Sequence, residues 1–254
     1  MNIRILGCSG GIGVGLATTS MAIDDDILID GGTGLGELSL EEMAAVRHIF
    51  LTHSHLDHIA GLPMLVDSIF ERIRTPIVVH ARPETLAALR EHIFNWVIWP
   101  DFTRLPSAEQ PVLRFEEFHP GQVMELGGRR IEAIAVNHVI PCVGYRIEAG
   151  GKAFAFSADT TTTDHFWEVL NAHARLDLLV AECAFPNREA DLSRMAYHYC
   201  PRLLAADLAK LRHRPRIYLS HPKPGMEQEI LAECRDLLQH LDLHLLSGGC
   251  RFTL

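Results

Sequence analysis

Residues 49–62 read Ile-Phe-Leu-Thr-His-Ser-His-Leu-Asp-His-Ile-Ala-Gly-Leu. They contain the pattern His-x-His-x-Asp-His, which is formed by His53, His55, Asp57 and His58. The apolar start of the stretch predicts a strand that leads into the cluster, and the residues after it turn into a helix. His53 and His55 then project from an extended segment, whereas Asp57 and His58 point elsewhere, so one cluster can serve two metals. Imidazole nitrogen and carboxylate oxygen are ligands for zinc, and also for manganese or iron.

A cluster of surface histidines without a metal is the alternative interpretation, and it is the usual one for an isolated histidine. The strand before the cluster and the pair Gly61 and Leu62 after it favour a metal site instead. The segment over residues 52–62 resembles the signature of the metallo-β-lactamase-fold hydrolases. That resemblance implies a four-layer αββα sandwich and further metal ligands downstream.

The length and composition are typical of one large enzyme domain. The 254 residues contain no obvious linker, so we expect a single hydrolase domain over residues 1–254. Hydrophobic residues make up 48% of the chain, which is enough for a sizeable core. No run approaches the ~18 apolar residues that span a bilayer, so we expect no membrane partner. Residues 1–7 are too short and too quickly glycine-rich for a signal peptide, which predicts a cytoplasmic protein.

The net charge limits the possible binding partners, and the cysteines indicate the redox state of the chain. The net charge of −9 argues against a nucleic-acid polymer as partner, because a broad nucleic-acid-binding face would be basic. The six cysteines are scattered and form no CxxC pair, so we expect reduced thiols in the core. A place in the site pocket is the alternative for Cys142 or Cys183.

Short apolar segments alternate with longer helical patterns along the chain. The pattern predicts strands over residues 2–6, 17–23, 27–29, 49–51, 76–80, 131–136, 144–149, 152–157, 178–180, 216–220, 244–246 and 251–253. It predicts helices over residues 38–46, 59–74, 83–94, 163–173, 201–212 and 227–241. This order indicates an α/β fold with a mixed sheet, whereas the four-layer form follows from the resemblance.

Four of these strands end next to a possible metal ligand. The four residues are His53, His138, Asp159 and His221. Residues at neighbouring strand ends meet at one rim of a sheet, where α/β folds build their sites. An isolated histidine at position 138 or 221 would more often be structural, but each follows an apolar strand in the expected order.

The resemblance implies two divalent metal ions, with zinc favoured over manganese or iron. One ion would bind His53, His55 and His138, the other would bind Asp57, His58 and His221, and Asp159 would bridge them. A hydroxide that bridges the ions would attack the substrate, because metal binding lowers the pKa of water to about 7. The remaining positive charge suits a small anionic substrate such as a phosphodiester.

Three more residues have expected roles. In the resembled fold an acid at the position of Asp30 orients the metal-ligand loop, although a simple turn residue is the alternative. Glu182 and His198 can form a pair that keeps the imidazole protonated and oriented. His198 is then the general acid for the leaving alkoxide, and a polar surface residue is its alternative. Asp57, Glu182 and His198 form the predicted catalytic set.

The pair of Glu182 and His198 resembles the phosphodiesterase branch of the family. Further segments resemble its class II cyclic-nucleotide phosphodiesterases, namely residues 51–62, 182–187 and 221–224. A small cyclic nucleotide is therefore the expected substrate, and the expected activity is that of a metal-dependent phosphodiesterase.

Ribonuclease Z, a tRNA 3′-processing endonuclease, is the alternative within this branch. Its long tRNA-binding arm lies between the positions of His138 and Asp159, where this chain has only a hairpin. A thioester or lactam hydrolase, a redox di-iron protein and a non-catalytic metal-binding protein are further alternatives.

Two stretches have no assigned role. The glycine-rich residues 7–15 lack the G-x-G-x-x-G spacing of dinucleotide-binding loops, but they can bring main-chain N–H groups near an anionic substrate. The aromatic residues 94–102 fit a flap over the site, a homodimer interface or core packing equally well, and they could stack a nucleobase.

Overall fold

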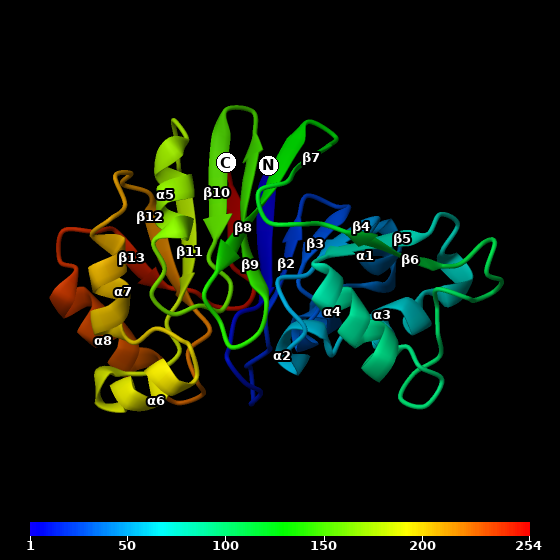
Figure 1. Ribbon diagram of the computed structural model, residues 1–254, viewed down its shortest axis with the longest axis horizontal. Helices are drawn as coiled ribbons and strands as arrows, with labels where there is room; N and C mark the ends of the chain where they lie inside the picture. Colours follow the sequence, from blue (N-terminus) through cyan, green and yellow to red (C-terminus); the bar gives the residue numbers. More distant parts are fainter.

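The computed structural model describes residues 1–254. Two seven-stranded sheets face each other and helices cover their outer faces, so the fold has four layers (Figure 1). The predicted αββα sandwich is confirmed.

The first sheet is antiparallel in one half and parallel in the other. Its strands, in spatial order, are β14 (Arg251–Thr253), β1 (Asn2–Gly7), β2 (Ser20–Ile23), β3 (Ile27–Ile29), β4 (His48–Phe50), β5 (Ile77–Ala81) and β6 (Leu113–Glu117). Pairing is antiparallel from β14 to β3 and parallel from β3 to β6. The last strand of the chain thus closes the sheet that the first strand begins.

The second sheet repeats this arrangement. Its strands, in spatial order, are β13 (Leu243–Leu245), β12 (Arg216–Ser220), β11 (Leu178–Glu182), β10 (Lys152–Phe156), β9 (Cys142–Ala149), β8 (Arg129–Val136) and β7 (Val123–Leu126). Pairing is parallel from β13 to β10 and antiparallel from β10 to β7. Strands β8, β10, β11 and β12 therefore run in the same direction, and their carboxyl ends lie at one edge of the sheet.

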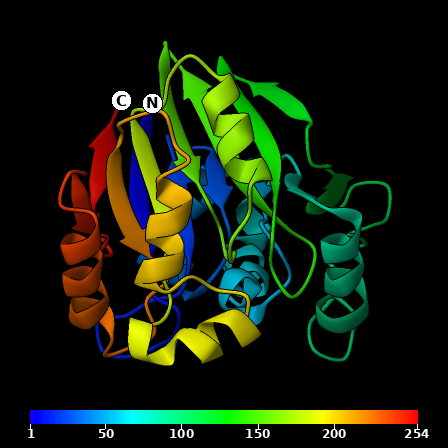
Figure 2. The same ribbon diagram turned by 60° about the vertical axis from the view of Figure 1, so that its left-hand side comes forward.

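The helices form the outer layers. Those on the side of the first sheet are α1 (Leu40–Ala45), α2 (Leu56–Ile59), α3 (Leu62–Ser68) and α4 (Pro83–Ala88), with short turns η1 (Thr33–Glu37), η2 (Phe70–Arg72) and η3 (Leu89–Ile93). Those on the side of the second sheet are α5 (His165–Ala172), α6 (Ala190–Met195), α7 (Pro201–Leu208) and α8 (Glu227–Leu237), with the turn η4 (Asn187–Glu189). Figure 2 shows α5, α7 and α8 beside one another over the second sheet, with α6 (yellow) below them.

Three cores follow from the layers. Ile27 and Ile29 belong to the core between the two sheets, whereas Leu28 belongs to the core between the first sheet and its helices. Strands that are buried on both faces consist of continuous apolar runs, which explains the Ile-Leu-Ile sequence of β3. A third core joins the second sheet to α5, α7 and α8.

Some predicted elements differ from the structure. The helix expected over residues 59–74 is broken, because Gly61 N–H donates to the Gly31 carbonyl at 2.7 Å instead of extending a helix from α2. The helix expected over residues 83–94 is α-helical only to Ala88 and ends in a π-helical turn. Strands β6 and β7 and helix α6 were not predicted; β6 and β7 have few buried positions, so they lack a clear apolar pattern.

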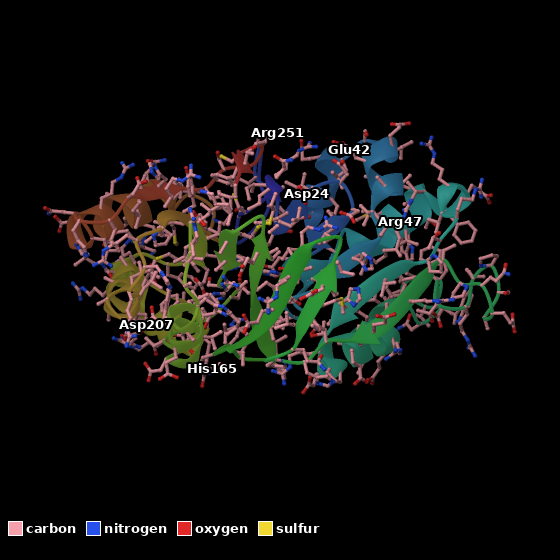
Figure 3. The ribbon with its side chains drawn as sticks, turned by 90° about the horizontal axis from the view of Figure 1, so that it is seen from above. Asp24, Glu42, Arg47, His165, Asp207 and Arg251 are labelled. Carbon is pink, nitrogen blue, oxygen red and sulfur yellow. The ribbon has the colours of Figure 1, made fainter.

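The two sheets are also joined by an ion pair at the end opposite α2 and α6, which Figure 3 views directly. Arg129 begins β8, and its Nη2 donates to Asp26 Oδ2 at 2.8 Å in the turn between β2 and β3. Its Nη1 also contacts Asp24 Oδ2 at 3.3 Å. The hydrogen bond from Arg129 lowers the pKa of Asp26. The turn between β2 and β3 thus anchors the first sheet to the second.

The aromatic stretch divides into buried and exposed parts. Phe94 and Phe102 are each 2% exposed and belong to the core under the first sheet. Trp96, Val97 and Ile98 are 57%, 85% and 61% exposed. Core packing therefore explains the ends of the stretch and leaves its tip without a partner.

The cysteine prediction is confirmed, since all six cysteines are free and all except Cys250 are buried. None of the helices combines the length and the apolar character that crossing a bilayer needs.

His80, a buried histidine on β5, should make the free energy of unfolding depend on pH. His80 stacks on Phe50 at a ring distance of 4.5 Å, its Nε2 lies 2.9 Å from His48 Nδ1, and its Nδ1 lies 3.7 Å from Glu116 Oε2. Burial, and then the positive charge of His48, lower the pKa of His80 to about 4. Between pH 6.5 and 4 the unfolded chain therefore binds a proton that the folded protein does not, so stability falls as the pH falls.

We expect His80→Gln to reduce the slope of unfolding free energy against pH in this window by up to about 1.4 kcal/mol per pH unit. Urea denaturation at several pH values measures the slope. The exposed His92→Gln is the matched control and leaves the slope unchanged. A slope that His80→Gln does not alter contradicts the assignment.

Candidate metal centre

The predicted ligands all lie at the edge where the parallel strands end. His53 follows β4, His138 follows β8, Asp159 follows β10 and His221 follows β12. Helix α2 begins directly after His55 and carries Asp57 and His58. Figure 1 shows α2 at this edge, at the bottom of the molecule. The structure thus brings together all seven side chains that the sequence proposed as ligands.

These side chains form two groups that share one carboxylate. The first group is His53, His55, His138 and Asp159, and the second is Asp57, His58, Asp159 and His221. Within each group the candidate ligand atoms lie within 4.8 Å of one another. The grouping is the one expected for two metals bridged by Asp159. Metal binding itself stays a prediction.

The residues fit metal ions because several of their atoms are buried without a hydrogen-bond partner. These atoms are His53 Nε2, His58 Nε2, Asp159 Oδ1, His221 Nδ1 and His221 Nε2. A buried polar atom without a partner costs about 1–3 kcal/mol. A cation placed among them would satisfy imidazole nitrogen and carboxylate oxygen together, which is the donor set of zinc, manganese or iron.

In His53, His58 and His138 one ring nitrogen has a partner that fixes the ring orientation. His58 Nδ1 lies 2.7 Å from Asp30 Oδ2, and His53 Nδ1 lies 2.9 Å from the Thr52 hydroxyl. His138 Nδ1 donates to the Tyr197 carbonyl at 3.0 Å. The other nitrogens of His53 and His58 have no hydrogen-bond partner, and His138 Nε2 faces His55 Nδ1 at 3.2 Å inside the first group. One nitrogen that is held by the protein and one that faces the site are typical of metal-binding histidines.

Asp30 lies where the sequence placed it, behind the ligand loop. It is fully buried, and it accepts from Thr52 N–H at 2.8 Å as well as contacting His58. Asp30 therefore holds both the start of the loop and one ring of the second group.

The protonation of the rings is suited to metal binding. Burial lowers the pKa of His138 to about 4 and holds the pKa values of His53 and His221 well below the usual range. These imidazoles are neutral at pH 7, which is the form that binds metals. At His58 burial is outweighed by the carboxylates of Asp159 and Asp30, which raise its pKa well above the usual range. A metal that binds the second group has to displace the His58 proton.

The proposed acid pair lies beside these groups. His198 Nδ1 is 2.8 Å from Glu182 Oε1, and its ring stacks on His221 at 5.2 Å. Glu182 is fully buried at the end of β11 and also accepts from Thr160 N–H at 3.0 Å. Burial opposes the charge on His198, but Glu182 outweighs it, so the pKa of His198 is raised. Glu182 thus orients this imidazole and favours its protonated form.

Comparison with known proteins identifies the family. The profile of the "Beta-lactamase superfamily domain" matches residues 26–221. The chain belongs to the beta-lactamase superfamily. The matched part of the superfamily domain contains every predicted ligand and the Glu182–His198 pair.

Sequence relatives in the superfamily include phosphodiesterases and ribonucleases. A probable 3′,5′-cyclic-nucleotide phosphodiesterase of Yersinia pestis is 28% identical over 72% of this chain. The matching region spans only 59% of that relative's length. A ribonuclease Z of Bradyrhizobium sp. is 27% identical over 83% of this chain and 85% of its own length.

Solved structures show the same fold. Unliganded yeast PDE1 has a TM-score of 0.83 and 20% identity, and the match covers 100% of this chain and 99% of the yeast chain. The short form of human tRNase Z has a TM-score of 0.72 and 17% identity, with coverage of 100% and 99%. These likenesses establish the metallo-β-lactamase fold of this superfamily member. The sequence relatives named above are hydrolases.

The main chain of the superfamily domain is strained around the site. Six residues other than glycine have a positive φ, and four of them are site residues or their neighbours: Asp30, Ala158, Tyr197 and His221. Such conformations cost about 1–3 kcal/mol each and cluster at functional sites. Here the left-handed turn at Tyr197 accompanies the carbonyl contact to His138.

Sequence reasoning missed several contributors to this site. The Thr52 hydroxyl and the Tyr197 carbonyl contact ligand rings, and neither belongs to a residue type that suggests a metal site. Gly10 belongs to the glycine-rich residues 7–15, but the sequence did not indicate that it packs against His221. A Cβ at Gly10 would lie 2.6 Å from the His221 carbonyl oxygen and 3.0 Å from its ring, so only glycine fits.

Because Asp159 belongs to both groups, its substitution should affect zinc binding differently from the substitution of a residue in one group. We expect wild-type protein to bind two zinc ions and His138→Ala to bind one tightly. Asp159→Ala should weaken both sites by at least about tenfold, because it removes a charged ligand from each group. Metal analysis after dialysis gives the stoichiometry, and zinc-induced thermal stabilisation reports the affinity.

His92→Ala is the control, since this exposed histidine lies outside both groups. Two zinc ions retained by Asp159→Ala with unchanged affinity would show that the carboxylate is not shared.

Proposed function

We propose that the protein is a dinuclear metal-dependent phosphodiesterase that cleaves a small phosphodiester, with a cyclic nucleotide as the favoured substrate. The observation that carries this proposal is the geometry of the site. Two ligand groups share Asp159, and a buried Glu182–His198 pair lies beside them. Zinc is the favoured metal for these nitrogen and oxygen ligands, with manganese or iron as alternatives.

The charge of the site supports an anionic substrate. Two divalent ions bound there would supply Lewis acidity and lower the pKa of a water molecule to about 7. Asp57 and Asp159 contribute two negative charges to the two groups. They therefore neutralise only half of the four positive charges, and a phosphodiester complements the remainder.

His198 and Glu182 have a separate task in this mechanism. Glu182 holds Nδ1 of His198 at 2.8 Å, which leaves Nε2 as the atom that can donate a proton. The ester oxygen that leaves from a ribose phosphodiester needs such a proton. His198 thus serves as the general acid and Glu182 positions it.

A ribonuclease Z-like activity is the second candidate, because the Bradyrhizobium ribonuclease Z matches most of both chains. Against it, β9 and β10 are joined by only residues 150 and 151, so no long arm lies between His138 and Asp159. The net charge of −9 also disfavours a tRNA-sized partner. Both features support a small substrate. A cytoplasmic location and a homodimer stay predictions.

The test uses protein loaded with zinc, and separately with manganese. Substrates are cyclic AMP, bis-p-nitrophenyl phosphate and a precursor tRNA. We expect cyclic AMP turnover that Asp57→Ala abolishes and that His198→Ala lowers by about 10²–10⁴-fold. His198→Ala should affect bis-p-nitrophenyl phosphate much less, because nitrophenolate leaves without a proton.

His119→Ala, an exposed histidine between β6 and β7, is the control and should keep full activity. Cleavage of precursor tRNA in preference to cyclic AMP would favour the ribonuclease. If no phosphodiester is turned over while two metals are bound, the phosphodiesterase proposal is wrong, and thioesters and lactams become the substrates to test.

A further inference from the structure

The chain has three lysines, and only one of them lacks a carboxylate partner. Lys152 pairs with Asp177 at 3.4 Å, and Lys210 pairs with Asp207 at 2.6 Å. Lys223 forms no ion pair, although the chain has 32 acidic residues. Its Nζ donates to the Gly10 carbonyl at 2.9 Å. An ammonium group has three N–H donors, so two of them remain free.

This unpaired lysine lies next to the candidate metal centre. Lys223 follows His221 by two residues, and its main-chain N–H donates to the Ala184 carbonyl at 3.0 Å. Its Nζ lies 6.0 Å from the centre of the Phe185 ring, and that ring contacts His198 at 5.9 Å. The Lys223 ammonium and the imidazole of the proposed general acid therefore both lie near the Phe185 ring.

The glycine-rich loop packs against the segment that carries Lys223. Gly10 N–H donates to the Pro222 carbonyl at 3.0 Å, which ties the loop to the segment after His221. The next residue, Gly11, lies so close to Pro224 that a Cβ there would be 3.0 Å from the proline ring. The glycine-rich loop and the segment around Lys223 therefore pack tightly against each other.

We propose that Lys223 forms an anion subsite that binds a non-bridging phosphoryl oxygen of the substrate. The inference rests on the proposed function in one respect, namely that the anion is a phosphate ester. An ammonium group suits this task as a compact charge with rotatable donors. Lys223 is thus a substrate-positioning residue, and it lies on the same side of the site as His198.

A structural role is the competing explanation, because Lys223 also tethers the glycine loop through Gly10. Lys223→Gln separates the two explanations, since its amide keeps a donor for Gly10 and loses the charge. Lys152→Gln is the matched control, because Lys152 is a lysine of the second sheet that pairs with Asp177.

The experiment measures binding of inorganic phosphate to the zinc-loaded protein by calorimetry. We expect Lys223→Gln to bind phosphate about 10–100-fold more weakly than wild type, as for the loss of one charge-assisted hydrogen bond. Lys152→Gln should stay within about twofold of wild type. Zinc content and thermal unfolding temperature should be unchanged in both variants, which a merely structural role for Lys223 would not allow.

Phosphate that binds wild type and Lys223→Gln equally, or does not bind wild type, overturns the subsite. A weaker affinity that is accompanied by a lower unfolding temperature and lost zinc also overturns it, in favour of the tether. If phosphate binding depends on Lys223 but no phosphodiester is turned over, the subsite holds and the proposed function fails. Where turnover exists, Lys223→Gln should raise KM for bis-p-nitrophenyl phosphate more than it lowers kcat.

Discussion

The carboxylate of Asp159 is the interaction on which the rest of the site depends. It is 2% exposed, with His58 Nε2 at 3.3 Å from one oxygen and His221 Nδ1 at 3.3 Å from the other. A buried carboxylate is stable only when it is paired, so both groups of histidines must meet at this point. They reach it because strands from both sheets end at the same edge. The two-sheet architecture thus places the two groups of side chains around Asp159.

The fold concentrates strain and unsatisfied polar atoms at this edge and compensates for them elsewhere. Left-handed residues and buried nitrogens without partners gather around His221, where a Cβ at Gly10 would clash. At the opposite end Arg129 joins the sheets through Asp26, and the core between the sheets is continuous. A rigid frame of this kind can hold geometry that the local chain would not choose.

The sequence predicts what is local and leaves out what depends on distant contacts. The clustering of the seven side chains was predictable because His53 to His58 lie within one short motif and the others follow apolar strands. The carbonyl of Tyr197 and the ammonium of Lys223 were not assigned roles, because their use depends on which side chains the folded loops bring near. The break at Gly61 was missed for the same reason, since its acceptor is 30 residues away at Gly31.

The most direct test of this account is anomalous diffraction at the zinc absorption edge from crystals of the zinc-loaded protein. We expect two zinc peaks on opposite sides of the Asp159 carboxylate, about 3.5–4 Å apart as in other two-metal sites. One peak should contact the rings of His53, His55 and His138, and the other those of His58 and His221. A single peak, or two peaks of which Asp159 contacts only one, would contradict the shared-carboxylate centre.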